Sequence, residues 1–308
     1  MNYTSHLTIA GFDFDIGCDI GIDNLQLPKA YHEFSGSAAG EHDARVSVEL
    51  MAGALKDVSK LQRCFDAGDM WSLFRDGETR YIVHTGGGIE SPMWCAAMPL
   101  DASSIRVHCG AELLEGSSDK LKPEKSEVES ISNPLRYPLD QILMTYLLSQ
   151  SKGVLLHSAG ILCNGRIWLL SGKSRAGKST SANLLKGLDG VELVSDDRII
   201  VRKIGDGFVG YGTPWPGEAK IAANKKAPLA GILFLDQSPH NKIDEISAVD
   251  AFERMMPVAS VPWYEPELFP GVMDFCGDIA DSLPMYRLQF RPDAEAAEMI
   301  AEMLRFGI

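Results

Sequence analysis

The sequence predicts an α/β protein in which a phosphate-binding domain of strands and helices follows a β-rich domain. Three observations predict this class. A complete phosphate-loop motif lies between an apolar run and a short helical segment. Short β-branched runs separated by glycine and polar turns fill residues 1–110. A polar, proline-flanked stretch at 115–134 separates the halves, so we place the domains at residues 1–130 and 131–308.

The composition suits two domains with cores of their own and argues against several classes of function. The chain has 308 residues, of which 45% are hydrophobic. Its formal net charge of -13 repels nucleic acids and anionic membranes, so we expect neither as a partner. The six cysteines lack C-x-x-C spacing, and no run approaches the roughly 20 apolar residues of a membrane span. Because the N-terminus also lacks a signal-peptide pattern, we expect a cytoplasmic protein.

The motif itself is SGKSRAGKST at residues 171–180, which fits G-x-x-x-x-G-K-S/T at every fixed position. Glycines let backbone N–H groups surround phosphates, Lys178 adds a positive charge at the β- and γ-oxygens, and the Ser179 hydroxyl can complete a Mg²⁺ shell. The strand before the loop and the helix after it are the context that this motif requires. We therefore predict a nucleotide site formed by Gly172, Lys173, Ser174, Arg175, Ala176, Gly177, Lys178, Ser179 and Thr180.

The residues before the loop predict a β-hairpin. Two apolar runs in GVLLHSAGILCNGRIWLLSGK, residues 153–173, are joined by Asn164-Gly165, a dipeptide that tolerates the positive φ of a type I′ turn. Counting outward from this turn brings His157 opposite Gly172, unless a bulge shifts the register. The helical spacing in residues 137–153 predicts a helix that introduces this domain.

A second strand with a polar end follows, in VELVSDDRIIVRKIG at residues 191–205. The intervening helix is short, so this strand is expected to run parallel to the one before the loop, with both active ends at one edge of the sheet. Phosphoryl transfer needs a metal and a group that takes the acceptor proton. We assign Asp197 to Mg²⁺ together with Ser179, and Asp196 to the acceptor proton, with the order of the two open. Without the upstream loop, a solvated Asp-Asp turn would be the simpler interpretation.

Three further side chains are weaker candidates. His157 can orient a carboxylate or contact the γ-phosphate, although most strand histidines are structural. Arg198 can pair with an aspartate or a phosphate. Asp236 ends the apolar run GILFLDQ, residues 231–237, and is a rival to the Asp196–Asp197 pair as a metal ligand.

The segment YGTPWPGEAKIAANKKAPL, residues 211–229, combines turn residues, an aromatic residue and lysines. Such a loop can close over a substrate, with Thr213 and Lys220 touching the acceptor or the phosphate. An ordinary surface loop in which Trp215 is a packing anchor accounts for the same residues equally well.

These motifs together resemble the HPr kinase/phosphorylase family, within the group that includes the ATP-dependent phosphoenolpyruvate carboxykinases. The resemblance rests on LLHSAGI, GKSRAGKST, LVSDDR and GYGTPWPGEAK in this order over residues 153–220, and on LPMYRLQFRPD near the end. It implies a P-loop kinase domain of the HPr kinase/phosphoenolpyruvate carboxykinase type. Arg175 and Ser158 stand where the family has glycine, and the segment linked to its phosphorylase activity is missing, which favours a divergent, serine kinase-type member with another acceptor.

We therefore expect an ATP- and Mg²⁺-dependent phosphotransferase whose catalytic residues are Asp196, His157 and Lys178. Its acceptor would be a serine-type hydroxyl on a small molecule, a peptide or a carrier protein. Two alternatives stay open: a lyase of the phosphoenolpyruvate carboxykinase type, and a non-catalytic nucleotide-binding regulatory module. The sequence also leaves open whether the chain forms a homo-oligomer.

Overall fold

A computed structural model describes residues 3–18, 25–36, 44–52, 57–68, 70–84, 92–115, 130–173 and 176–306 of the chain. The chain divides into two units, Met1–Leu147 and Leu148–Ile308. Both units combine helices with β-sheets, which confirms the predicted mixed α/β class. Most of the polar stretch at 115–134 lies outside the described residues.

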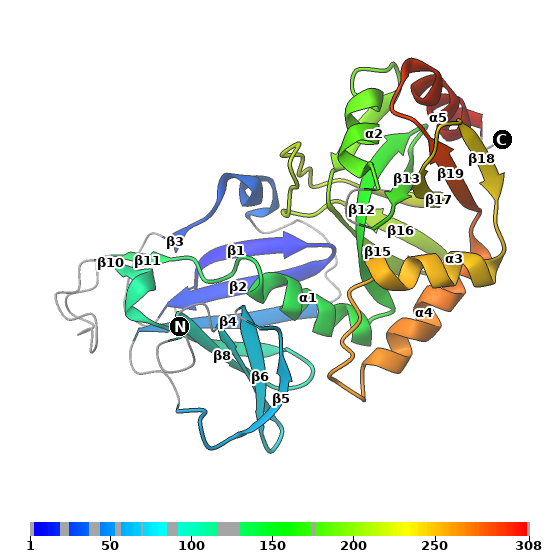
Figure 1. The fold of residues 1–308 in the computed structure, drawn as a ribbon. Coiled ribbons are helices and arrows are strands. Elements are labelled where there is room, and N and C mark those ends of the chain that lie inside the picture. The colour runs from blue at the N-terminus through cyan, green and yellow to red at the C-terminus, as the bar shows by residue number, and fades with distance from the viewer. Residues whose placement is uncertain are drawn as a thin grey trace. The chain divides into compact units, whose positions relative to one another are not determined.

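The first unit is dominated by strands, as expected (Figure 1). Its elements are β1 (Tyr3–Ile9), β2 (Phe12–Cys18), β3 (Leu25–Gln26), η1 (Lys29–Phe34), β4 (Ala44–Ala52), β5 (Gln62–Asp66), β6 (Trp71–Asp76), β7 (Thr79–His84), β8 (Trp94–Met98), β9 (Ser104–Cys109), η2 (Ala111–Leu113), β10 (Leu114–Glu115), β11 (Ser130–Ser132) and α1 (Leu139–Gln150). One sheet of eight strands has the order β1-β2-β4-β9-β8-β7-β6-β5, and a small one has the order β10-β11-β3. Pairings between neighbours in sequence are antiparallel, whereas β2–β4 and β4–β9 are parallel.

The predicted helix of residues 137–153 is α1, and most of it belongs to the first unit. Its start is tied there because the Tyr31 hydroxyl donates a hydrogen bond to the buried Asp140 carboxylate. The chain divides into the two units between Leu147 and Leu148, inside this helix, and the sequence predicted the domain boundary between residues 130 and 131.

The second unit is a layered α/β structure. Its elements are β12 (Gly153–Cys163), β13 (Arg166–Ser171), α2 (Lys178–Leu185), β14 (Val191–Ser195), β15 (Arg198–Ile204), β16 (Gly207–Tyr211), β17 (Lys226–Gln237), β18 (Lys242–Glu245), α3 (Ala248–Met255), η4 (Met256–Val258), α4 (Phe269–Ser282), β19 (Met285–Phe290) and α5 (Ala294–Phe306). The strand order β13-β12-β15-β16-β17-β19-β18 is completed by β14 on β12 and by a parallel β13–β17 pairing.

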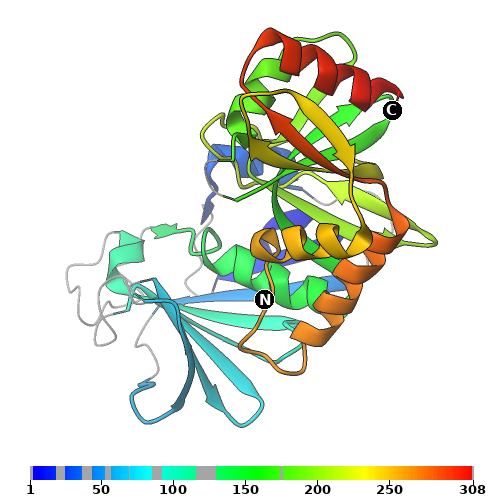
Figure 2. The ribbon, with the colours of Figure 1, turned by 45° about the vertical axis from the view of Figure 1, so that its right-hand side comes forward.

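The central strands of this unit are buried on both faces. Along β13, Ile167 and Leu169 enter one hydrophobic cluster with residues of α3 and α4, while Trp168 and Leu170 enter a second cluster with residues of α2 and α5. Figure 2 shows the two helix pairs, α3 beside α4 and α2 beside α5. A strand covered on both faces needs apolar residues at consecutive positions, which explains the uninterrupted run IWLL before the phosphate loop.

The long strand β12 changes neighbours along its length. From Gly153 to His157 it pairs with β15, and from Ser158 to Cys163 it pairs with β13 in the predicted hairpin. Asn164 and Gly165, with φ of 50° and 73°, form its turn, and the pairing has no bulge. β14 pairs with β12 from Gly160 to Cys163, antiparallel as β13 does, so β13 and β14 run in the same direction, as predicted.

Among the described residues, no helix is both long and apolar enough to cross a membrane.

Close packing around Gly231 in β17 leaves no room for a side chain, and replacing this glycine tests how tightly the core is packed. A Cβ atom added there would lie 2.6 Å from the Pro284 carbonyl oxygen and 2.7 Å from the Trp168 ring. We expect Gly231→Ala to lower the free energy of unfolding by about 1–3 kcal/mol, because backbone and a buried ring must both move. Urea unfolding measures the change. Gly207→Ala is the control, since nothing lies within 4 Å of its added Cβ; equal losses in both variants would contradict the packing account.

Candidate functional site

The phosphate-loop motif lies between β13 and α2, as the sequence predicted. Gly177 precedes α2 with a φ of 106°, and an added Cβ would lie 2.7 Å from the Phe290 ring. Only glycine satisfies both the conformation and the space at this position. A Cβ on Gly172 would likewise lie 2.8 Å from that of Ala176. Ser174 and Arg175 lie outside the described residues, as does the side chain of Ser179.

Lys178 is the charged group at the centre of this loop. Its side chain is buried, and its Nζ donates to the carbonyl oxygens of Gly172 at 2.9 Å and Lys173 at 3.3 Å. Burial lowers the pKa of Lys178, while the nearby Asp197 carboxylate opposes this change. The ammonium group is therefore held at the Gly172 side of the loop, within electrostatic reach of Asp197.

Asp197 is the centre of a second cluster, with His157 and Arg198. His157 Nε2 lies 2.8 Å from Asp197 Oδ1, and Arg198 Nε lies 3.3 Å from Asp197 Oδ2. His157 and Arg198 are themselves partners in the β12–β15 register, so both side chains reach the same carboxylate. The three side chains keep between 22% and 30% of their surface exposed, so solvent or a ligand can reach them.

The charges of this cluster control the ionisation of Asp197. Burial by itself would raise the pKa of Asp197, but the hydrogen bond from His157 and the positive charges of Arg198, His157 and Lys178 lower it below its ordinary value. The carboxylate consequently stays charged at neutral pH. An ionised carboxylate can accept a hydrogen bond from a hydroxyl group and can serve as an oxygen ligand of Mg²⁺.

Asp196 has a different environment from its neighbour. Its carboxylate is 2% exposed and accepts hydrogen bonds from three backbone N–H groups, those of Gly217 at 2.9 Å, Ala219 at 2.7 Å and Ile221 at 3.1 Å. The sequence assigned Asp196 to the acceptor proton. These contacts are those of a carboxylate that anchors a loop, whereas the neighbouring Asp197 carboxylate meets His157 and Arg198.

Ser195 contacts both the aspartate turn and the loop that follows β16. Ser195 Oγ accepts the backbone N–H groups of Asp197 at 3.4 Å and Arg198 at 3.2 Å, which shapes the turn that carries both aspartates. Ser195 also pairs with Ala222 across the loop. The sequence analysis did not predict this role of Ser195, although a serine immediately before two aspartates is a turn signal.

The residues predicted to contact a substrate differ in how far they are buried. Thr213 is fully buried and its hydroxyl donates to the Arg198 carbonyl at 2.8 Å, so it is a structural residue here. Trp215 is also buried, as expected for a packing anchor. Lys220 is exposed, with a φ of 56° in the same loop. Of these three residues, only Lys220 can meet a ligand without rearrangement.

Asp236, the rival metal ligand, ends β17 beside the phosphate loop, but arginines already neutralise it. Arg287 Nε lies 2.6 Å from one carboxylate oxygen and Arg254 Nη1 lies 3.2 Å from the other. Burial tends to raise the pKa of Asp236, and the two arginines outweigh burial and lower it. Two guanidinium groups oppose binding of a cation at Asp236, whereas Asp197 has one guanidinium partner, Arg198, together with His157. A cavity of about 610 Å³ adjoins this residue, lined among others by Gly172, Lys173, Asp236, Asp250, Glu253 and Arg254.

The described residues offer a limited set of metal ligands. They contain no group of three or more histidine, cysteine, aspartate or glutamate side chains arranged to hold a metal ion. Protein-bound Mg²⁺ commonly uses one or two carboxylates, with phosphate oxygens and waters completing its shell. Asp197 beside the phosphate loop fits that requirement, and Ser179 is the predicted second ligand.

No protein-family model matches the chain, and no curated protein matches it either. Among solved structures, it is similar to the Hpr(Ser) kinase/phosphatase from Coxiella burnetii, with 12% sequence identity and a TM-score of 0.27 over 47% of this chain and 85% of that one. This is a distant likeness at the level of the fold. An identity and a TM-score this low carry no conclusion about activity, and we therefore rely on the contacts of the site residues.

The anchoring role of Asp196 can be measured directly. We expect Asp196→Ala to lower the free energy of unfolding by about 2–4 kcal/mol, because three loop N–H groups lose their acceptor. Hydrogen exchange should also accelerate at the amides of Gly217, Ala219 and Ile221. Glu218→Ala is the matched control in the same loop, since the Glu218 side chain is exposed. Unchanged exchange at these amides in Asp196→Ala would contradict the role.

Asp197 should also set the pH range in which Lys178 attracts phosphate. Asp197→Asn removes the negative charge that opposes the effect of burial, so the pKa of Lys178 should fall further. Lys178 of the variant then loses its proton, and with it the affinity for pyrophosphate, at a lower pH than in the wild type. Calorimetric titration between about pH 7 and about pH 10.5 tests this. Asp206→Asn, in an exposed turn, should keep the wild-type profile; identical profiles for all three proteins would refute the coupling.

Proposed function

We propose that this protein is an ATP- and Mg²⁺-dependent phosphotransferase that phosphorylates a serine-type hydroxyl on a small molecule, a peptide or a protein. One observation carries the proposal: Lys178 of the phosphate loop and the His157–Asp197–Arg198 cluster come together where β12 changes partners. A phosphate-binding lysine and an ionised carboxylate within electrostatic reach of each other are the parts that transfer to a hydroxyl requires.

The roles follow from the charges and contacts. Backbone N–H groups of the phosphate loop and Lys178 bind the donor phosphates. Asp197 accepts a hydrogen bond from the acceptor hydroxyl, orients it towards the γ-phosphorus and receives its proton. The new O–P bond forms as the bond from the γ-phosphorus to the β–γ bridging oxygen breaks, and ADP leaves. His157 and Arg198 hold the Asp197 carboxylate in position. Asp197 and Ser179 would hold Mg²⁺, which would supply neutralisation of the phosphate charge.

The lowered pKa of Asp197 is compatible with this role. A carboxylate is a weak base, but transfer of a phosphoryl group proceeds through a loose transition state in which the hydroxyl loses its proton late, so orientation matters more than basicity. Arg198 adds a positive charge next to the transferring group. Asp196 contributes indirectly, because it fixes the loop that covers this turn.

The test is transfer from γ-labelled ATP with Mg²⁺ to a panel of acceptors: serine, other small hydroxyl compounds, serine-containing peptides and an HPr-type carrier protein. We expect label in one acceptor class. Asp197→Asn should slow transfer by about 10²–10⁴-fold, as expected on losing a general base, and change ATP affinity only a few-fold. Asp206→Asn should transfer at the wild-type rate.

Other results would point to the alternatives. ATP binding without transfer to any acceptor would favour a nucleotide-binding regulatory module. Decarboxylation of a dicarboxylate coupled to phosphorylation would favour the lyase. Full activity in Asp197→Asn would remove Asp197 from the chemistry.

A further inference from the structure

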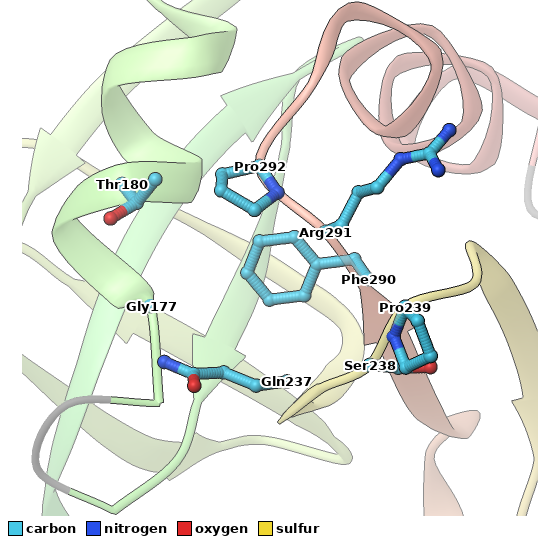
Figure 3. Close-up of a pocket in the computed structure, with 8 residues that line it drawn as sticks. All are labelled: Gly177, Thr180, Gln237, Ser238, Pro239, Phe290, Arg291 and Pro292. Carbon is cyan, nitrogen blue, oxygen red and sulfur yellow. The ribbon is translucent and has the colours of Figure 1, made fainter.

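A second cavity, of about 470 Å³, borders the other side of the phosphate loop (Figure 3). Gly177 and Thr180 of the loop and α2 lie on one side of it. Residues from the ends of β17 and β19 lie on the other, namely Gln237, Pro239, Phe290 and Pro292. We call this the Pro239–Pro292 pocket. It is separate from the charged cavity at Asp236, although Gln237 borders both.

The chemistry of this pocket is apolar with a few neutral polar groups. Three of its rings belong to Pro239, Phe290 and Pro292, and its neutral polar side chains are Thr180, Gln237 and Ser238. Arg291 is the one charged residue among the described residues that line it. Its guanidinium is paired with the carboxylates of Asp293 and Glu295, and in Figure 3 it points away from the other labelled side chains. The pocket therefore suits a flat, neutral, largely apolar group and not an anion.

The direction of a bound polyphosphate connects this pocket to the loop. Lys178, which reaches the β- and γ-phosphates in such motifs, has its Nζ at the carbonyls of Gly172 and Lys173. The terminal phosphates are therefore expected near Gly172. Lys178, which lies at this side of the loop, also interacts electrostatically with Asp197. The remainder of the donor then leaves the loop at its other end, beside Gly177 and Thr180, which is where the pocket opens.

We propose that the Pro239–Pro292 pocket binds the nucleobase of the phosphoryl donor, so that the donor is a nucleoside triphosphate and not a base-free polyphosphate. This inference rests on the proposed function, because it assumes that the loop binds the donor phosphates. The proline and phenylalanine rings would contact the base, and the Gln237 amide, which points towards Gly177 in Figure 3, can donate to or accept from its polar edge.

Two variants at one position test the proposal. Pro239→Trp fills the pocket, whereas Pro239→Ala leaves it open, and Pro239 is exposed, so neither change disturbs the core. Calorimetry in Mg²⁺ would measure ATP and inorganic tripolyphosphate against both variants and the wild type. We expect the wild type to bind ATP at least about tenfold more tightly than tripolyphosphate. Pro239→Trp should remove this preference, with tripolyphosphate affinity unchanged, and Pro239→Ala should retain it.

The outcomes separate this inference from the proposed function. If the wild type binds ATP and tripolyphosphate equally, or if Pro239→Trp keeps full ATP affinity, the pocket does not bind the base, while phosphate binding by the loop stands. If the wild type binds neither ligand, the phosphate site itself fails and the inference fails with it. If Pro239→Trp weakens both ligands equally, the tryptophan acts on the phosphate loop and the base assignment is refuted.

Discussion

The middle of β12, at His157 and Ser158, is the position around which the candidate site is arranged. On one side of this point β12 pairs with β15, which begins at Arg198, and on the other it pairs with β13, which ends at Ser171. The phosphate loop therefore follows the residue that pairs with Ser158, and the aspartate turn precedes the residue that pairs with His157. Backbone pairing fixes the positions of Ser171 and Arg198, the residues next to the phosphate loop and the aspartate turn.

The cluster is also an electrostatic unit. Lys178 is buried and pays a desolvation cost that lowers its pKa, and Asp197 offsets part of this effect. Asp197 in turn keeps its charge through His157, Arg198 and Lys178. Lys178 and Asp197 therefore each favour the charged form of the other, whereas Arg198 favours the charge of Asp197 and opposes that of Lys178. This mutual dependence is what we expect of a site prepared for a ligand with several negative charges.

Asp196 and Asp197 are neighbours in the turn before β15, but they have different contacts. Asp196 points into the loop of residues 217–221 and has its oxygens satisfied by backbone N–H groups, while Asp197 points to His157 and Arg198. The three hydrogen bonds tie the Asp196 carboxylate to this loop. The same loop buries Thr213 and Trp215, and only its exposed part, which includes Lys220, is available for contacts with a ligand.

The sequence by itself determined the features that are local in the chain. The Asn164-Gly165 turn set the hairpin and its register, and the glycine spacing set the phosphate loop, because both depend on a few adjacent residues and their φ angles. The sequence could not show which role belongs to which aspartate. Adjacent side chains point in different directions, and only packing decides which of them meets the loop. The sequence also could not show the Pro239–Pro292 pocket, whose walls come from separate segments of the chain. Those segments become neighbours only because β17 pairs with both β13 and β19, a long-range contact that no local pattern encodes.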